Sequence, residues 1–318
     1  MGKKKNLWPI LYLYIAFLII LLCPSLSMSN ERIRKPSVAG YFYPDDKEGL
    51  RKTIDDFITN AEAQQIDGKI LGIMSPHAGY VFSGQTAAYS YKNIAGKPYD
   101  TVIIIGPSHH VYLKGASVGN WDAYLTPLGK VDVNKEIVES LLSEKEYFDF
   151  IERAHSQEHS IETQIPFLQR VLRNFNIVPI LMGRSTLGYC EQISDAILKT
   201  VKGKNVLFVA STDMSHYPDY NNANKVDRNT LSLIEKFDPG LVFDSEAKTL
   251  KEGVPNLSTT LCGLSSVVTM MMTVKKLGGD SSKILYYANS GNTTVNGYQE
   301  RRRVVGYGAA AFYKKKER

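Results

Sequence analysis

Histidine is scarce in this chain, and its placement is the most informative feature of the sequence. Six occur among 318 residues. His77, His109 and His216 each follow, by a few residues, an apolar run that is typical of a buried strand. The carboxyl ends of parallel strands meet at one edge of a sheet, where open α/β folds bind their ligands. Because imidazole is the commonest metal ligand, we expect these three side chains to converge on one site. His110 is interpreted as an ordinary turn residue.

One cysteine stands where it could join these histidines. Cys262 directly precedes a helix predicted over residues 263–277, and a helix N-terminus favours the thiolate, the form that binds metals and acts as a nucleophile. The alternative interpretation is a small, buried apolar residue. A disulfide with Cys190 is a third interpretation in an exported protein. The residues alone leave the three open.

A second motif, His-Ser-Gln-Glu-His at residues 155–159, has the letters of an inverted zinc-protease signature. That chemistry requires both histidines on one face of a single helix. The apolar periodicity begins only at His159, so we expect the helix to start there and do not predict a zinc protease. His155 is interpreted as structural. Glu158, His159 and Glu162 are candidates for orienting a ligand or transferring protons.

The elements that must position these residues alternate along the chain. Strands are predicted at residues 70–74, 101–105, 177–182, 205–210, 284–288 and 304–312, and helices at 47–63, 84–94, 160–173 and 263–277. Apolar strands separated by helices predict a largely parallel sheet with helices on both faces. After an exposed lead-in at residues 30–36, no linker composition appears. One α/β domain is therefore expected over residues 30–318.

The first 29 residues are a different kind of sequence. Residues 1–6 are basic, 7–22 are almost wholly apolar and 25–29 are small and polar, which is the order of a secretory signal. An uncleaved membrane anchor is the alternative, although the apolar run is shorter than the roughly 20 residues of a span. In either case we expect the folded domain outside the cytoplasm, exported to the periplasm or medium or anchored to the membrane.

The charge balance excludes some classes of partner. The formal net charge is +6, and 43% hydrophobic with 22% charged residues is ordinary for a globular protein. Three of the positive charges are Lys3, Lys4 and Lys5, in the N-terminal segment. No basic face interleaved with aromatic residues appears, so no nucleic-acid partner is expected. Membrane contact is expected only through the N-terminal segment.

Taken in order, the motifs of this chain resemble those of the Memo family, known in prokaryotes as protein B of the AmmeMemoRadiSam system. The matching stretches are SVAGYFYP (37–44), PHAGY (76–80), GPSHH (106–110), TPLG (126–129), EHSIE (158–162), PF (166–167), STDMSH (211–216), CG (262–263) and VGY (305–307). They run in the order of the family from about residue 33 to 313. Each motif is weak alone, and the combination is specific.

The resemblance implies a fold similar to class III extradiol dioxygenases, in which two histidines and a carboxylate hold non-haem iron. Carried over residue by residue, the metal ligands fall on His77, His109 and Cys262, so Cys262 should not be paired with Cys190. A thiolate in place of the carboxylate is a softer ligand. The metal ion is accordingly expected to be iron or copper, with zinc as the alternative.

The remaining family positions fall on Asp213, His216 and His159, which the resemblance places around the same pocket. His216 and His159 would act as acid and base groups, with Asp213 orienting an imidazole. We therefore expect a metal-binding oxidoreductase, of dioxygenase or other redox type, acting on a small organic substrate. The alternatives are a non-enzymatic module that holds a ligand or peptide in the pocket, and a metal-assisted hydrolase.

Overall fold

The computed structural model describes residue 2 and residues 31–316. The chain divides into two compact units, residues 1–31 and 32–318, and all the described helices and strands belong to the second. The predicted signal or anchor segment lies outside the described residues. Among the residues that are described, no helix is both long and apolar enough to cross a membrane.

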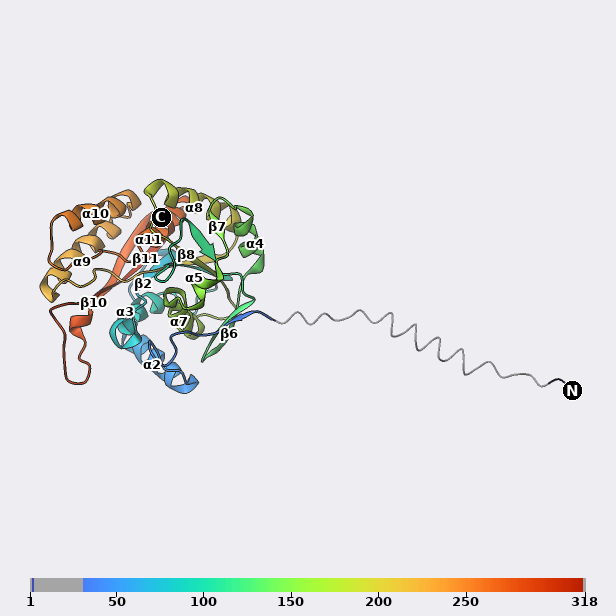
Figure 1. Ribbon diagram of the computed structural model, residues 1–318, viewed down its shortest axis with the longest axis horizontal. Helices are drawn as coiled ribbons and strands as arrows, with labels where there is room; N and C mark the ends of the chain where they lie inside the picture. Colours follow the sequence, from blue (N-terminus) through green and yellow to red (C-terminus); the bar gives the residue numbers. More distant parts are fainter. Residues whose placement is uncertain (1, 3–30, 317–318) are drawn as a thin grey trace. The chain divides into compact units, whose positions relative to one another are not determined.

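An eight-stranded sheet forms the centre of the second unit, in the order β10-β11-β2-β9-β3-β8-β4-β7 (Figure 1). Its strands are β2 (Gly68–Ser75), β3 (Thr101–Pro107), β4 (Ala116–Val118), β7 (Phe148–Asp149), β8 (Asn176–Met182), β9 (Val206–Ser211), β10 (Ser281–Asn289) and β11 (Gly306–Lys315). The four middle strands, β2, β9, β3 and β8, run parallel, as predicted. The flanking pairs β10–β11, β11–β2 and β4–β8 are antiparallel. The sheet is thus parallel at its centre and mixed overall.

The middle strands are apolar on both faces because helices cover both sides. Every residue of β3 and of β9 is buried. One face carries α3 (Tyr80–Lys92) and α7 (Gln164–Val171), and the other carries α8 (Leu187–Val201) and α11 (Leu264–Lys276) (Figure 1). The α/β class, with helices on both faces of the sheet, is confirmed.

Peripheral elements complete the domain. Helix α2 (Lys47–Asn60) packs on α3, and α4 (Lys135–Ser143) packs on α8. Helices α9 (Tyr220–Glu235) and α10 (Pro239–Lys251) pack on each other. A small separate sheet consists of β1 (Ile33–Arg34), β5 (Ala123–Thr126) and β6 (Gly129–Asp132). Helix α3 begins four residues earlier than the predicted start at Gly84. The helix accommodates a glycine at this position because α2 packs closely against it, and a Cβ there would overlap the Phe57 ring.

The helix predicted over residues 160–173 is divided. The structure has α5 (Glu152–Ser156), α6 (His159–Glu162) and α7, with Thr163 between the last two. Pro166 has no N–H to donate to the carbonyl of Glu162, which favours the break between α6 and α7. Because α5 ends at Ser156 and α6 begins at His159, His155 and His159 lie on different helices, which confirms that the motif at 155–159 lacks zinc-protease geometry.

Candidate metal centre

The four parallel strands each place a polar side chain at the same edge of the sheet. His77, His109, Arg184 and Asp213 each stand two positions beyond the last residue of β2, β3, β8 and β9. The predicted convergence of His77 and His109 is confirmed. A third histidine, His159 of α6, joins them, and one ligand atom from each of these three rings lies within 4.8 Å of the others.

The three imidazoles pack against one another. Ring centroids are 5.1 Å apart for His77 and His109, 5.3 Å for His77 and His159, and 4.5 Å for His109 and His159. The ring of Phe42, whose centroid is 4.9 Å away, packs against His159. These contacts bring three ring nitrogens into a space suited to a single ion.

The hydrogen bonds of His77 determine which of its nitrogens carries the proton. Its Nδ1 lies 2.9 Å from the Ser211 hydroxyl oxygen. That hydroxyl donates its proton to the Ser160 carbonyl at 2.6 Å, and it accepts a bond from the Gln164 amide at 3.0 Å. The Ser211 oxygen can therefore only accept from His77, so Nδ1 is protonated and Nε2 keeps its lone pair. Burial lowers the pKa of His77 well below its usual value, so the ring is neutral.

Glu158 contacts Nδ1 of His109, as Ser211 contacts Nδ1 of His77. Its carboxylate accepts the His109 Nδ1–H at 2.8 Å and the His109 main-chain N–H at 2.6 Å. It also caps α6, accepting the N–H groups of His159 and Ser160, each at 2.9 Å. Burial would raise the pKa of Glu158, but its bond to His109 and the charge of that ring hold it at about 2. A carboxylate behind the Nδ1–H of an imidazole is the usual outer partner of a metal-binding histidine.

The pKa values of His109 and His159 are shifted in opposite directions, although both rings lie near the Glu158 carboxylate. Burial lowers the pKa of His109, but the hydrogen bond to Glu158 and its negative charge outweigh burial and raise the pKa. Burial lowers the pKa of His159 to about 4 despite the nearby Glu158. At pH 7 His159 is therefore neutral and able to bind a metal ion or accept a proton.

Cys262 reaches the cluster from the start of α11. Its Sγ lies 3.2 Å from Nε2 of His77 and accepts the Asp213 main-chain N–H at 3.2 Å. The surroundings of the sulfur oppose the predicted effect of the helix N-terminus, which favours the thiolate. Burial, reinforced by the negative charge of Asp213, raises the pKa of the Cys262 thiol. Cys262 and Cys190 are both free thiols, and Cys190 is buried in α8.

Asp213 supports the turn that carries His77. Its Oδ1 accepts the main-chain N–H groups of His77 at 2.8 Å and of Ala78 at 3.3 Å, and its Oδ2 lies 4.0 Å from His77 Nε2. Burial raises the pKa of Asp213 to about 6, although these two N–H donors oppose the shift. Asp213 thus bonds to the main chain of His77, and its role in orienting an imidazole stays a prediction.

His216 approaches the centre without joining the three-histidine cluster. It lies five positions beyond the end of β9, and its ring packs on Tyr217 at 5.5 Å between centroids. Burial, together with the charge of His109, lowers the pKa of His216 to about 4. Its Nε2 is buried and has no hydrogen-bond partner among residues 31–316.

The two histidines interpreted as structural are not members of the three-histidine cluster. His155 is buried, with Nε2 3.0 Å from the Ser117 hydroxyl and its ring against Trp121. His110 is exposed, and its ring centroid is 6.4 Å from that of His159. Sequence reasoning missed Ser211 and Arg184. Arg184 occupies the same position after its strand as His77 and His109, and that signal could have found it.

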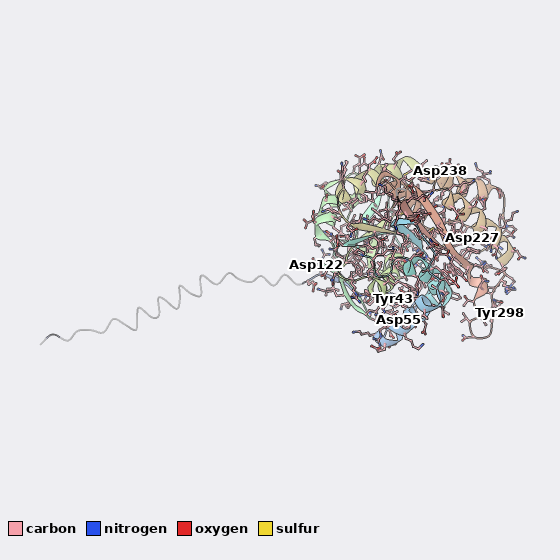
Figure 2. The ribbon with its side chains drawn as sticks, turned by 180° about the vertical axis from the view of Figure 1, so that it is seen from behind. Tyr43, Asp55, Asp122, Asp227, Asp238 and Tyr298 are labelled. Atoms are coloured by element: carbon pink, nitrogen blue, oxygen red, sulfur yellow. The ribbon has the colours of Figure 1, made fainter. Side chains whose placement is uncertain are left out.

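Asp227 is a buried carboxyl whose ionisation should make the stability of the fold depend on pH. Asp227 of α9, labelled in Figure 2, accepts the Ser215 N–H at 2.9 Å, the Ser215 hydroxyl at 3.0 Å and the Tyr287 hydroxyl of β10 at 2.8 Å. Burial raises the pKa of Asp227 to about 7, although these bonds oppose the shift. A raised folded-state pKa stabilises the fold fully at low pH, and this contribution is lost as the pH rises through 7.

We therefore expect the contribution of Asp227 to the free energy of unfolding to fall by roughly 2–3 kcal/mol between pH 5 and 8. Asp227→Asn should remove that share, since an amide keeps the shape but does not titrate. Urea unfolding at the two pH values measures the difference, with the exposed Asp244→Asn as control. The prediction would be contradicted if the free energy of unfolding changed with pH by the same amount in the native chain and in Asp227→Asn.

The donor set fits a transition-metal ion. In His77 and His109, Nδ1 contacts Ser211 and Glu158, so Nε2 is the remaining ligand atom of each ring, and a third imidazole and a thiol stand beside them. Nitrogen and sulfur donors of this kind suit zinc, copper and iron rather than magnesium or calcium.

Comparison with known proteins agrees with the motifs. The family model described as Memo-like protein matches residues 34–311. A MEMO1 family protein of Methanobrevibacter smithii is 38% identical over 76% of this chain and 86% of its own length. MEMO1 family proteins of Thermotoga neapolitana and Saccharolobus solfataricus are each 37% identical over 75% of this chain, and the matches cover 87% and 86% of their own lengths. The structure of an uncharacterized protein of Escherichia coli K12 aligns with a TM-score of 0.44 and 10% identity, covering 75% of this chain and 99% of that one.

Proposed function

The chain belongs to the Memo family, and from that premise we propose that it holds one redox-active metal ion and acts as an oxidoreductase on a small organic molecule. The observation that carries the proposal is the tautomer of His77. Its Nε2 lone pair, left free by the Ser211 contact, points to within 3.2 Å of Cys262 Sγ. That separation is shorter than about 4.4 Å, the sum of typical zinc–nitrogen and zinc–sulfur bonds, so both atoms can contact the same ion.

We assign His77, His109 and Cys262 as the ligands. Iron or copper, with zinc as the alternative, would supply Lewis acidity and, for the first two, one-electron chemistry. A positive charge at Sγ would also offset the burial that keeps the Cys262 thiol protonated, so binding at neutral pH releases a proton. Glu158 orients His109, and Asp213 orients the His77 turn.

His159 and His216 are assigned to proton transfer. Burial lowers the pKa of both to about 4, so each is a neutral base at pH 7. His159 stands against both ligand histidines and is also able to serve as a fourth ligand. The unpartnered Nε2 of His216 can bind a polar group of the substrate.

A cobalt spectrum tests the ligand assignment. In the full chain purified without a polyhistidine tag and loaded with Co²⁺, a thiolate ligand should give a near-ultraviolet charge-transfer band. We expect Cys262→Ser to abolish this band, and Cys190→Ser, the matched control, to retain it. His159→Ala should also retain the band. If His159→Ala abolishes cobalt binding and Cys262→Ser leaves the spectrum unchanged, the ligands are three histidines and the assignment of Cys262 is wrong.

A further inference from the structure

A cavity of about 300 Å³ adjoins the metal centre. Two of the assigned metal ligands, His109 and Cys262, form part of its wall. The rest comes from the end of β3 and the turn after it, the end of β8 and the turn after it, residues 258–259 before α11, and the first turn of α11. None of the described residues that line it is acidic. A ligand in this cavity would lie directly beside the metal.

The N-terminus of α11 faces this cavity with free donors. The helix has 13 residues, and its N-cap, Gly263, has no side chain to accept a hydrogen bond. The main-chain N–H groups of Ser265 and Ser266 have no acceptor in the part of the chain that the structure describes. Free N–H groups and the helix dipole together attract a negative group.

An independent observation also indicates a missing partner. Ser266 is among the residues that line the cavity, and its side chain is completely buried, yet its hydroxyl has no hydrogen-bond partner among residues 31–316. Buried hydroxyl groups are nearly always paired, because burying one without a partner is unfavourable. An acceptor atom in the cavity would satisfy it.

Arg184 adds a positive charge to the same wall. Its Nη2 lies 2.9 Å from Oε1 of Glu246 in an ion pair, and Glu246 also accepts the Thr259 hydroxyl at 2.5 Å and the Thr260 N–H at 3.3 Å. The Arg184 side chain is 68% exposed, so its other N–H groups remain available to a ligand. A planar guanidinium matches the geometry of a carboxylate.

The other residues of the cavity wall indicate what kind of ligand would fit. Val111, Leu113, Met182 and Leu264 contribute apolar surface. Arg184 is the one arginine or lysine that lines the cavity among the described residues, and Glu246 partly neutralises it. These features suit a single negative charge on an apolar molecule better than the double charge of a phosphate group.

We propose that the cavity binds the carboxylate of a small, apolar organic acid, through the Ser266 hydroxyl, the first N–H groups of α11 and Arg184. This names the substrate class of the proposed oxidoreductase and rests on that function only in calling the acid a substrate. The bound acid would lie against His109 and Cys262, with its apolar body along Val111 and Met182.

Calorimetric titration of the full chain with benzoate tests the proposal. The neutral isostere benzamide and the dianion phenyl phosphate are the comparison ligands, and metal-free and zinc-loaded protein are both measured. Benzoate should bind more tightly than either. Ser266→Ala and Arg184→Gln should each weaken benzoate binding by about 10-fold, since both remove a bond to a charged group. The exposed Arg173→Gln is the matched control and should change nothing.

The variants also separate this proposal from the metal proposal. Metal content should be unchanged in Ser266→Ala and Arg184→Gln, and Ser266→Ala removes a hydroxyl that has no partner, so the fold should persist. Benzoate affinity unchanged in both variants would overturn the proposal, as would equal binding of benzamide or tighter binding of phenyl phosphate. Variant-sensitive benzoate binding in a protein that takes up no metal would refute the metal function and leave the carboxylate site standing.

Discussion

Replacing Arg34 by Met is expected to lower the free energy of unfolding by about 3–5 kcal/mol, because it leaves a buried carboxylate without its counter-charge. Arg34 and Glu162 form an ion pair in which 2% and 1% of the side-chain surfaces are exposed. Glu162 also accepts bonds from the Ser37 N–H at 2.8 Å, the Val38 N–H at 3.0 Å and the hydroxyl of Tyr43, labelled in Figure 2. Arg34 in turn donates to the main-chain carbonyl of Glu158 at 2.7 Å.

Urea denaturation of Arg34→Met measures the loss. The matched control is Arg32→Met, two residues earlier, whose ion pair with Glu152 has 50% and 61% of its side chains exposed and should contribute less than about 1 kcal/mol. Similar losses in the two variants would contradict the prediction. Because Arg34 holds the end of α5 and the start of α6, it positions Glu158 and His159 as well as stabilising the fold.

The sequence predicted part of the metal centre because strand ends are visible as local patterns. His77 and His109 each follow a short apolar run by two residues, and parallel pairing brings them together. His216 looked equivalent but lies five residues beyond β9, so its ring does not join the cluster. His159 joined the cluster instead. Its position depends on the Arg34–Glu162 pair, which links residues 128 positions apart, and no local pattern reports such a contact.

The fold shows the same division between local and distant determinants. Apolar runs predicted the parallel centre of the sheet, since strands buried on both faces are apolar throughout. They did not reveal that β11 enters between β10 and β2 and runs antiparallel to both, because a run of apolar residues does not specify its neighbour. The exposed lead-in expected at residues 30–36 is wrong at Arg34, which is buried in β1. From the sequence alone, a charged residue at this position is predicted to be exposed unless its ion-pair partner is known.

Replacing His77 by Ala is expected to weaken metal binding by more than about 100-fold, since even the outer partners of metal ligands typically contribute about 10–100-fold. The side chain is buried, and its polar contacts are with Ser211 and Cys262 at the sheet edge. The fold should therefore survive the substitution, as circular dichroism can verify. The matched control is His155→Ala, which also removes a buried imidazole but lies on α5, against Ser117 and Trp121.

Elemental analysis of the chain purified without a polyhistidine tag tests the metal centre most directly. We expect one iron or copper ion per chain in the native protein and in His155→Ala, and no stoichiometric metal in His77→Ala. A native protein without bound metal would contradict the account and favour a module that binds a ligand or peptide in the pocket. Metal content in His77→Ala equal to that of the native protein would contradict it as well.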